Sequence, residues 1–546
     1  MQLSEKSIVR KYLPAILIGV MQWFLSGLLK LDTCFFTYES VTEHMIIVKI
    51  VFLIAIIFWW CFVLNIYRKI KERDAIYVRA LRFFLVYFLF ILILFVVLWP
   101  GTWSWDDLWT LNQISTYSSF TPWQNIITGI YLDLLLQIIP FPWGIILIQN
   151  IIIAICVSCI IVKLEKYYKL VFSNNKIIDM IIKLIPFFLP PVLMYQLSGY
   201  RMGMYVHLEA LLLVLLLTGY KDKEWRWNQS LLICFLTVIV SIWRTESFIY
   251  ILLTIGTYCV IRMQLYKKAM CICLILIGFF SLNQWQNAQL GDDNYKIISI
   301  MGPCVELVRV ADPISDADEL ANIDKITSID IIRDNPYLDG EELYWHTDCV
   351  RNMNDNPYDD YTVEDYNLYF KSFLSLSVKY PMIVLKERWN TFWNSAVVSD
   401  VTTTNINRSA TLFDDNVTNN ALTSVSSYDC FSSKPILYKL RKATIFLFGG
   451  FDINGSPMIT RKLVWNSIIP ILIIVYACIH SLTQKRWYWV LICSAVISRL
   501  AIVFLTQPGS WFMYLLSFYY LGMFYGIYNF MEQLRQVKMN NGKRCR

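Results

Sequence analysis

Charged residues are scarce in this chain of 546 residues. Asp, Glu, Lys and Arg together make up 16% of the sequence, whereas hydrophobic residues make up 57%. A soluble globular protein carries about a quarter charged residues. The composition therefore excludes an ordinary soluble protein and predicts a multi-pass protein of the cell membrane.

The sequence also offers little that would require a metal or a nucleic acid. Many of its 14 cysteines, among them Cys156, Cys234 and Cys271, lie inside apolar runs, where Cys acts as a small hydrophobe. The net charge of +7 comes mainly from Lys and Arg gathered in particular loops. We therefore expect no nucleic-acid partner, and no cofactor is required by the sequence.

Long apolar runs account for most of the chain, and each of about 20 residues can cross a bilayer as a helix. The first run has no small-residue cleavage site and predicts a span, not a cleaved signal. We expect about twelve spans, near 13–29, 46–66, 80–99, 143–162, 180–197, 204–219, 229–243, 247–261, 269–284, 465–482, 487–506 and 511–530.

The loops between these runs alternate in charge. With twelve spans, all strongly basic loops and both termini fall on one side, which the positive-inside rule assigns to the cytoplasm. This parity requires that the apolar stretch 123–139 does not cross the membrane, and we expect a juxtamembrane helix on the outer face there. Residues 285–464, which are polar, then lie outside.

The predicted fold is an all-α polytopic membrane protein with a large extracytoplasmic α-rich or α+β loop domain. Its expected parts are two N-terminal helices (1–79), a membrane core with an acidic outer loop at 100–142 (80–284), the outer domain (285–464), and C-terminal helices with a basic cytoplasmic tail (465–546).

The acidic loop follows the third span and holds the strongest chemical signal. Four tryptophans surround the adjacent carboxylates Asp106 and Asp107 in the segment Trp99-Pro-Gly-Thr-Trp-Ser-Trp-Asp-Asp-Leu-Trp109. Tryptophan favours the membrane–water interface, so we expect the carboxylates there, in reach of a lipid-borne substrate. The alternative is that they only cap a surface helix beginning at Leu108.

Polar residues within the spans map to their outer halves. An Arg or Glu at membrane depth costs about 2–3 kcal/mol on insertion scales, so it should be paired or line a cavity. The pattern predicts a polar cavity open to the outer leaflet, with Arg201, Arg244, Arg499, Glu209, Glu246 and His207 around it. Duller interpretations stay open: Arg201 as a snorkelling side chain, Arg244–Glu246 as a simple ion pair, and His207–Glu209 as a packing contact.

These features together resemble the GT-C membrane glycosyltransferases, and most closely GT-C-like proteins of low-GC Gram-positive bacteria. The resemblance rests on Pro100-Gly101…Asp106, on Thr506-Gln-Pro508-Gly-Ser-Trp-Phe-Met-Tyr514, and on the order of spans and outer domain over residues 80–284 and 465–530. The chain departs from the pattern at Tyr200-Arg201-Met202, where relatives carry a Lys-Asp pair.

The resemblance implies transfer of a sugar from a polyprenyl-phosphate donor to a cell-envelope acceptor (glycan, lipid or protein) at the outer membrane face, with inversion. Asp106 or Asp107 would be the general base, with Mg²⁺ or Mn²⁺ at this pair as an option. Arg201, Arg244 and Arg499 would bind the lipid phosphate, supported by Glu246, His207 and Glu209. A polysaccharide polymerase or ligase, and a lipid or solute transporter, remain the alternatives.

Overall fold

The computed structural model describes residues 2–103, 105–117, 124–222, 225–290, 297–351, 362–397, 435–450 and 458–544. The regular secondary structure of these residues consists of helices. The only β-type pairings among the described residues are two isolated bridges, Thr102–Ser198 and Thr327–Val350. The described residues are therefore those of an all-α protein.

Seven helices are long and apolar enough to cross a membrane. They are α2 (Glu43–Lys71), α3 (Ala75–Val97), α6 (Pro142–Tyr168), α9 (Arg201–Asp222), α12 (Leu265–Leu290), α22 with α23 (Ile459–Val464 and Ile468–Thr483) and α24 (Trp487–Thr506). An eighth span results if α7 (Lys176–Leu184), η2 (Ile185–Phe187) and α8 (Pro190–Gln196), bent by 71°, are counted as one. These helices support the prediction of a multi-pass membrane protein.

The expected number of twelve spans stays a prediction. Four of the expected spans correspond to helices that are either short or less apolar: α1 (Gln2–Leu28), whose apolar part begins at Tyr12, α10 (Trp227–Trp243), η3 with α11 (Thr245–Phe248 and Ile249–Val260), and the tyrosine-rich α25 (Leu516–Arg544). Short spans need a thin membrane region or neighbours that cover their ends.

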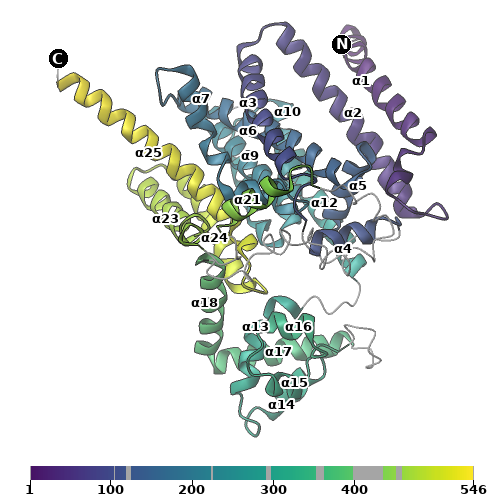
Figure 1. The fold of residues 1–546 in the computed structure, drawn as a ribbon, viewed down its shortest axis with the longest axis vertical. Coiled ribbons are helices and arrows are strands. Elements are labelled where there is room, and N and C mark those ends of the chain that lie inside the picture. The colour runs from purple at the N-terminus through teal and green to yellow at the C-terminus, as the bar shows by residue number, and fades with distance from the viewer. Residues whose placement is uncertain are drawn as a thin grey trace.

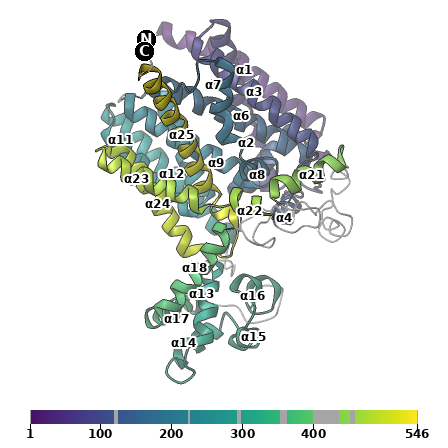
Figure 2. The ribbon, with the colours of Figure 1, turned by 60° about the vertical axis from the view of Figure 1, so that its left-hand side comes forward.

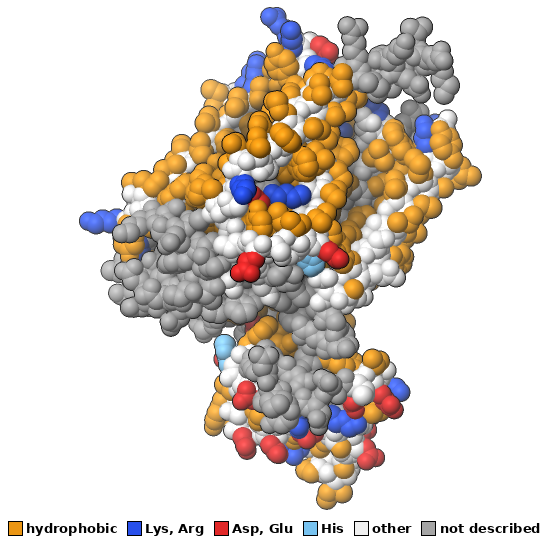
Figure 3. Space-filling view, turned by 90° about the vertical axis from the view of Figure 1, so that its right-hand side faces the viewer, with side chains coloured by type: hydrophobic (Ala, Val, Ile, Leu, Met, Phe, Trp, Pro, Cys, Tyr) orange, Lys and Arg blue, Asp and Glu red, His pale blue; other side chains and the backbone are white. Residues whose placement is uncertain are grey.

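Helix α9 lies at the centre of the bundle. It packs against α6, α8, α10, α11, α24 and α25, and 94% of its apolar window is buried. By contrast, α2 and α12 expose most of their apolar side chains, and Figure 3 shows a broad hydrophobic surface over the bundle. Apolar side chains that face outward on this scale require lipid around them.

The two chain ends lie at the end of the bundle opposite a small helical domain (Figures 1 and 2). This domain consists of α13 (Ile298–Val310), α14 (Ala317–Asp324), α15 (Ile329–Asp334), α16 (Gly340–His346) and α17 (Val363–Lys379). It has its own hydrophobic core, which includes Met301, Ile323, Leu343 and Tyr369. The two chain ends and this domain therefore lie at opposite ends of the bundle. Their assignment to the two sides of a membrane stays a prediction.

Helix α18 (Pro381–Val397) joins this domain to the bundle (Figure 2). The buried Arg388 donates from Nη1 to the carbonyl oxygen of Gln507 at 2.7 Å, just beyond the end of α24. A cation at a helix C-terminus offsets the partial negative charge of the last carbonyls. The contact therefore holds the domain against the end of α24.

The juxtamembrane helix expected over 123–139 is present as α5 (Ile126–Ile138), but it is packed within the protein. Nine of its residues are buried, and it contacts α2, α6 and α10. Trp123, the expected start of this helix, lies outside the described residues. The apolar character of α5 thus comes from burial among helices and not from lying on the membrane surface.

The first two helices are fastened to α5 by a polar cluster. Lys49 on α2 donates to Asp32 Oδ2 at 2.8 Å and to Gln137 Oε1 at 2.6 Å. Tyr117, which follows α4 (Trp105–Ile114), donates to the same Asp32 oxygen at 3.5 Å. The N-terminal helix pair therefore packs against the elements that follow the acidic loop.

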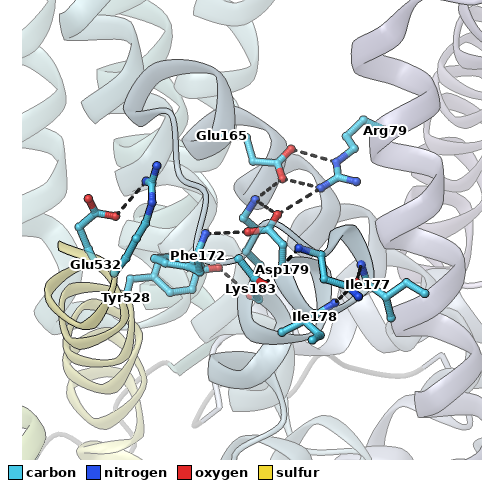
Figure 4. A network of polar contacts seen from close by, with 12 residues as sticks. Arg79, Glu165, Phe172, Ile177, Ile178, Asp179, Lys183, Tyr528 and Glu532 are labelled. Carbon is cyan, nitrogen blue, oxygen red and sulfur yellow. Dashed lines mark hydrogen bonds and ion pairs between the residues drawn. The ribbon is translucent and has the colours of Figure 1, made fainter. Parts of the chain in front are cut away.

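A second buried cluster ties α3, α6 and α7 together toward the end that holds the termini (Figure 4). Lys183 donates to Glu165 at 2.6 Å and to Asp179 at 2.5 Å, and Arg79 also pairs with Glu165 at 2.9 Å. The opposite face of α7 exposes Ile177, Ile178 and Ile181. Because its charges point inward and its isoleucines outward, α7 is suited to lie against lipid.

Candidate functional site

The acidic loop begins with a tightly packed glycine. Gly101 has φ +98°, and a Cβ atom at this position would lie 2.0 Å from Ile146 Cδ1. Thr102 then donates from its backbone to Leu197 O at 3.0 Å, and Gly199 donates to Thr102 O at 3.2 Å. The loop is therefore fixed to the segment that connects α8 to α9.

A second support comes from α21 (Tyr438–Gly449). Its buried Arg441 donates to Gly101 O at 2.7 Å and to Leu98 O at 3.3 Å. The chain beyond the small domain thus returns to the bundle and holds the start of the acidic loop.

Asp107 lies in the first turn of α4 and is buried. The position of a carboxylate there agrees with both earlier interpretations, because the first turn of a helix favours negative charge. The side chain of Asp106 lies outside the described residues. Its role therefore stays a prediction.

Charges from different parts of the chain act on Tyr195. Arg461, Asp107 and Arg244 each interact electrostatically with its hydroxyl. Tyr195 itself is almost completely buried, and its hydroxyl has no hydrogen-bond partner among the described residues. A buried hydroxyl without a partner is uncommon and indicates a place where a polar ligand or water completes the contacts.

Arg244 and Arg499 belong to one chain of buried ion pairs. Arg499 donates to Glu209 at 2.6 Å and to Glu246 Oε1 at 3.3 Å, and the same Glu246 oxygen accepts from Arg244 Nε at 2.7 Å. The two arginines and the two glutamates balance in charge. The structure therefore brings together four of the expected residues and accounts for their burial without a ligand.

The two arginines differ in how fully their donors are used. Arg499 Nη1 also donates to Ser517 Oγ at 2.7 Å, so both of its Nη groups have acceptors, and the side chain is not exposed. Tyr250 and Ser517 donate to the Glu209 carboxylate. For Arg244, only Nε has an acceptor within the described residues, and its guanidinium carbon lies 5.0 Å from the centre of the Tyr514 ring. Arg499 Nε also has no partner among the described residues, but both Nη groups of Arg499 are in use. Within the described contacts, Arg244 thus has two free Nη groups for a ligand, whereas Arg499 is mainly an internal partner.

Arg201 does not join this chain in the described contacts. It is half-buried at the start of α9 and donates from Nη1 to Gln124 O. Its Nε has no partner among the described residues. Phosphate binding by Arg201 stays a prediction.

His207 is a packed core residue. Its Nδ1 is 2.8 Å from Gly203 O, and its ring centre is 5.2 Å from that of Tyr520. It is completely buried two residues, or about half a turn, before Glu209. Its Nε2 has no partner among the described residues, so a packing contact between His207 and Glu209 stays a prediction, whereas Glu209 belongs to the ion-pair chain.

The small domain reaches the same region through the turn after α24. Glu341 on α16 accepts a hydrogen bond from Trp511 Nε1, and Trp511 is followed by η7 (Phe512–Tyr514). The ring centre of Phe512 lies 6.5 Å from that of Tyr195, while Tyr514 contacts Arg244. One turn therefore links the domain to both Tyr195 and Arg244.

Sequence reasoning missed Tyr195, Arg441 and Arg461. Tyr195 is one tyrosine among 33, and its only signal is its place one residue before the polar Gln196. The polar composition of residues 285–464 predicts one outer domain, and that prediction includes Arg441 and Arg461. The apolar stretch that follows Arg441, Ala443 to Gly449, is the signal that this part returns to the bundle.

The described residues contain no group of three or more His, Cys, Asp or Glu side chains able to hold a metal ion. Since the side chain of Asp106 is not described, Mg²⁺ or Mn²⁺ at the acidic pair stays a prediction. In comparisons with known proteins, no family model matches this chain, and no curated protein or solved structure matches it.

Proposed function

We propose that this protein is an inverting membrane glycosyltransferase of the GT-C type. It moves a sugar from a polyprenyl-phosphate donor to a cell-envelope acceptor on the membrane side that bears the small domain. The observation that carries this proposal is that a buried carboxylate, Asp107, and an arginine with uncommitted donors, Arg244, lie within electrostatic range of the same unpartnered hydroxyl, that of Tyr195.

The chemistry of sugar transfer needs such a pair. The acceptor hydroxyl attacks the sugar C1 atom, the bond between C1 and the phosphate oxygen breaks, and that oxygen keeps the bonding electrons. Asp107 takes the acceptor proton as general base. Arg244 stabilises the negative charge that builds on the departing phosphate, because guanidinium presents a planar fork of donors to phosphate oxygens.

The ion-pair chain behind Arg244 acts as a positioning device in this proposal. Glu246 receives Arg244 Nε, and Arg499 holds the same Glu246 oxygen from the other side. Arg244 is therefore held through Nε, and its guanidinium lies beside the Tyr514 ring. The sequence predicts three phosphate-binding arginines of equal rank. We propose one phosphate ligand, Arg244, which is supported by the buried Arg499 through Glu246.

Binding of undecaprenyl phosphate to the purified chain in nanodiscs tests the assignment of Arg244. A hydrogen bond to a charged group is worth about 1.5–3 kcal/mol, so Arg244→Gln should weaken binding by about 10–100-fold. Arg244→Lys should recover only part of this loss. Arg262→Gln is the matched control, because Arg262 is exposed in the loop between α11 and α12.

Unchanged affinity in Arg244→Gln would remove the phosphate site from this region. The alternatives are tested in the same preparation. A transporter would move the lipid or a solute across the bilayer in vesicles and tolerate Asp107→Asn, whereas a polymerase or ligase would bind the lipid phosphate but not need the acidic pair.

A further inference from the structure

Helix α18 presents two tryptophans away from the protein. Trp389 and Trp393 are 55% and 45% exposed, and their ring centres lie 6.0 Å apart with an interplanar angle of 21°. With Asn390 and Asn394 they line a shallow hollow of about 270 Å³. Large exposed aromatic side chains of this kind mark a surface that contacts another phase or molecule.

The level of α18 relative to the membrane follows from α24. Its 20 residues span about 30 Å at 1.5 Å per residue, which is about the thickness of the hydrocarbon core. Thr506, its last residue, therefore lies at the boundary between hydrocarbon and headgroups. Trp487, at the opposite end of α24, is likewise exposed, as expected of an interfacial tryptophan.

Two contacts place the end of α18 at that boundary. Gln507, the residue after α24, donates from Nε2 to Ser395 Oγ at 3.4 Å. The Phe392 and Phe504 ring centres lie 5.7 Å apart. Trp393 and Trp389 come two and six residues before Ser395, which is about 3 and 9 Å along the helix axis.

At about 3 Å Trp393 lies within the headgroup layer, which extends about 5–8 Å beyond each side of the hydrocarbon core, and at about 9 Å Trp389 lies at the outer edge of this layer. On α24, Leu505 at the boundary is itself 56% exposed. Tryptophan is the residue that prefers this layer, because its ring is apolar and its N–H needs a partner.

We infer that Trp389, Trp393, Asn390 and Asn394 form a binding surface for lipid headgroups of the membrane leaflet on the domain side. The indole rings enter the headgroup layer, and the two amides supply hydrogen bonds to headgroup oxygens. The surface adds a membrane contact to the protein contacts that hold α18 against the end of α24. This inference is independent of the proposed transferase activity.

Spin labels on a cysteine-free full-length chain in nanodiscs of phosphatidylcholine and phosphatidylglycerol test the inference. Labels at Asn394→Cys and Asn390→Cys should be more accessible to oxygen, which partitions into lipid, than to a water-soluble nickel complex. A label at Lys371→Cys, exposed on α17, is the aqueous control. Adding Trp389→Ala and Trp393→Ala should shift the label at residue 394 toward water.

Three outcomes would overturn the inference. The label at residue 394 could be as aqueous as that at residue 371. It could be shielded from both relaxing agents, which would mean that protein covers the surface. It could also be aqueous but become shielded only when a soluble oligosaccharide is added, which would mean that the tryptophans bind glycan. The labelled positions and both tryptophans are exposed, so these substitutions should not affect folding. The cysteine-free chain, which also replaces buried cysteines such as Cys156 and Cys304, is first shown to unfold at the same temperature as the wild type.

Discussion

Arg499 donates to the carboxylate of Glu209 at 2.6 Å, and neither side chain exposes any surface. The two residues are 290 positions apart in the chain, on α24 and on the central helix α9. Their contact therefore fastens the C-terminal helices to the centre of the bundle. A buried pair of this kind is costly to disrupt on one side, because the remaining charge cannot be solvated.

Arg499→Met should destabilise the protein by about 3–5 kcal/mol, since Glu209 is left buried without its partner. The double variant Arg499→Met with Glu209→Leu should be markedly more stable than the single variant, because no uncompensated charge remains at this contact. Thermal unfolding of purified protein in detergent measures both. Lys325→Ala, which breaks an exposed pair with Asp365 on the domain, should cost less than about 1 kcal/mol.

If the single and double variants were equally destabilised, the cost would come from lost packing volume and not from an unpaired charge. The double variant also distinguishes the role of Arg499 from that of Arg244. Undecaprenyl phosphate binding by the folded fraction of the double variant should fall less than in Arg244→Gln, because Arg499 is proposed to act only through Glu246.

Gly101 and Gly256 should respond in opposite directions to alanine. At Gly101 the φ of +98° and the short approach to Ile146 make a Cβ unfavourable; the left-handed region alone costs about 1–2 kcal/mol. At Gly256, within α11, nothing lies within 4 Å of the added Cβ, so alanine should stabilise the helix by up to about 1 kcal/mol. Thermal unfolding of the two variants tests this contrast.

Adding Ile146→Val to Gly101→Ala should recover part of the loss, because it removes the methyl group that the new Cβ approaches. Full stability in Gly101→Ala alone would mean that the loop is not held as the structure describes. In a transfer assay, the same variant should lose activity along with the position of the acidic loop.

Asp107→Asn should reduce sugar transfer by about 10²–10⁴-fold, the usual contribution of a general base. Because asparagine keeps the size of the side chain, and the charge lost from the first turn of α4 is worth only about 0.3–1 kcal/mol, folding should be preserved. Undecaprenyl phosphate affinity should also be preserved, since the proposed phosphate ligand is Arg244. Transfer is measured with lipid-linked sugars extracted from membranes, and Asp334→Asn, on the exposed end of α15, serves as the control. Wild-type transfer by Asp107→Asn would contradict the proposed base.

Local sequence signals predicted the apolar helices, and they singled out Arg244, Glu246, Arg499 and Glu209, which the structure brings together. They could not predict the pairing, because Glu209 and Arg499 come from distant helices that only tertiary packing brings together. The same holds for Arg441, whose contact with Gly101 spans 340 positions. Periodicity identifies an apolar helix such as α5 but does not distinguish lipid from neighbouring helices as its surroundings.

The small domain should lose stability as the pH falls from about 4 to about 2. Asp365 caps α17, where its carboxylate accepts hydrogen bonds from Thr362 and Lys325. The Thr362 side chain, followed by Lys325, lowers the pKa of Asp365 to about 2, against about 3.9 for an unfolded aspartate. A carboxylate with a lowered pKa in the folded state contributes stability above the unfolded pKa, and the contribution disappears as the pH falls through the folded pKa. Hydrogen bonding by Lys379, with a further contribution from Tyr380, lowers the pKa of Asp316 in the same direction. Backbone hydrogen bonds from Ser315 and Ile314 also lower the pKa of Asp312, so three carboxylates contribute.

Pepsin, which is active in this pH range, should cleave the full-length protein in nanodiscs within residues 317–379 faster as the pH decreases. Asp365→Asn should already be cleaved faster at pH 4 and should show a shallower dependence on pH, with Asp316 and Asp312 accounting for the remainder, while Asp334→Asn should follow the wild type. An equal pH slope in Asp365→Asn and the wild type would mean that the capping carboxylate does not hold this domain together.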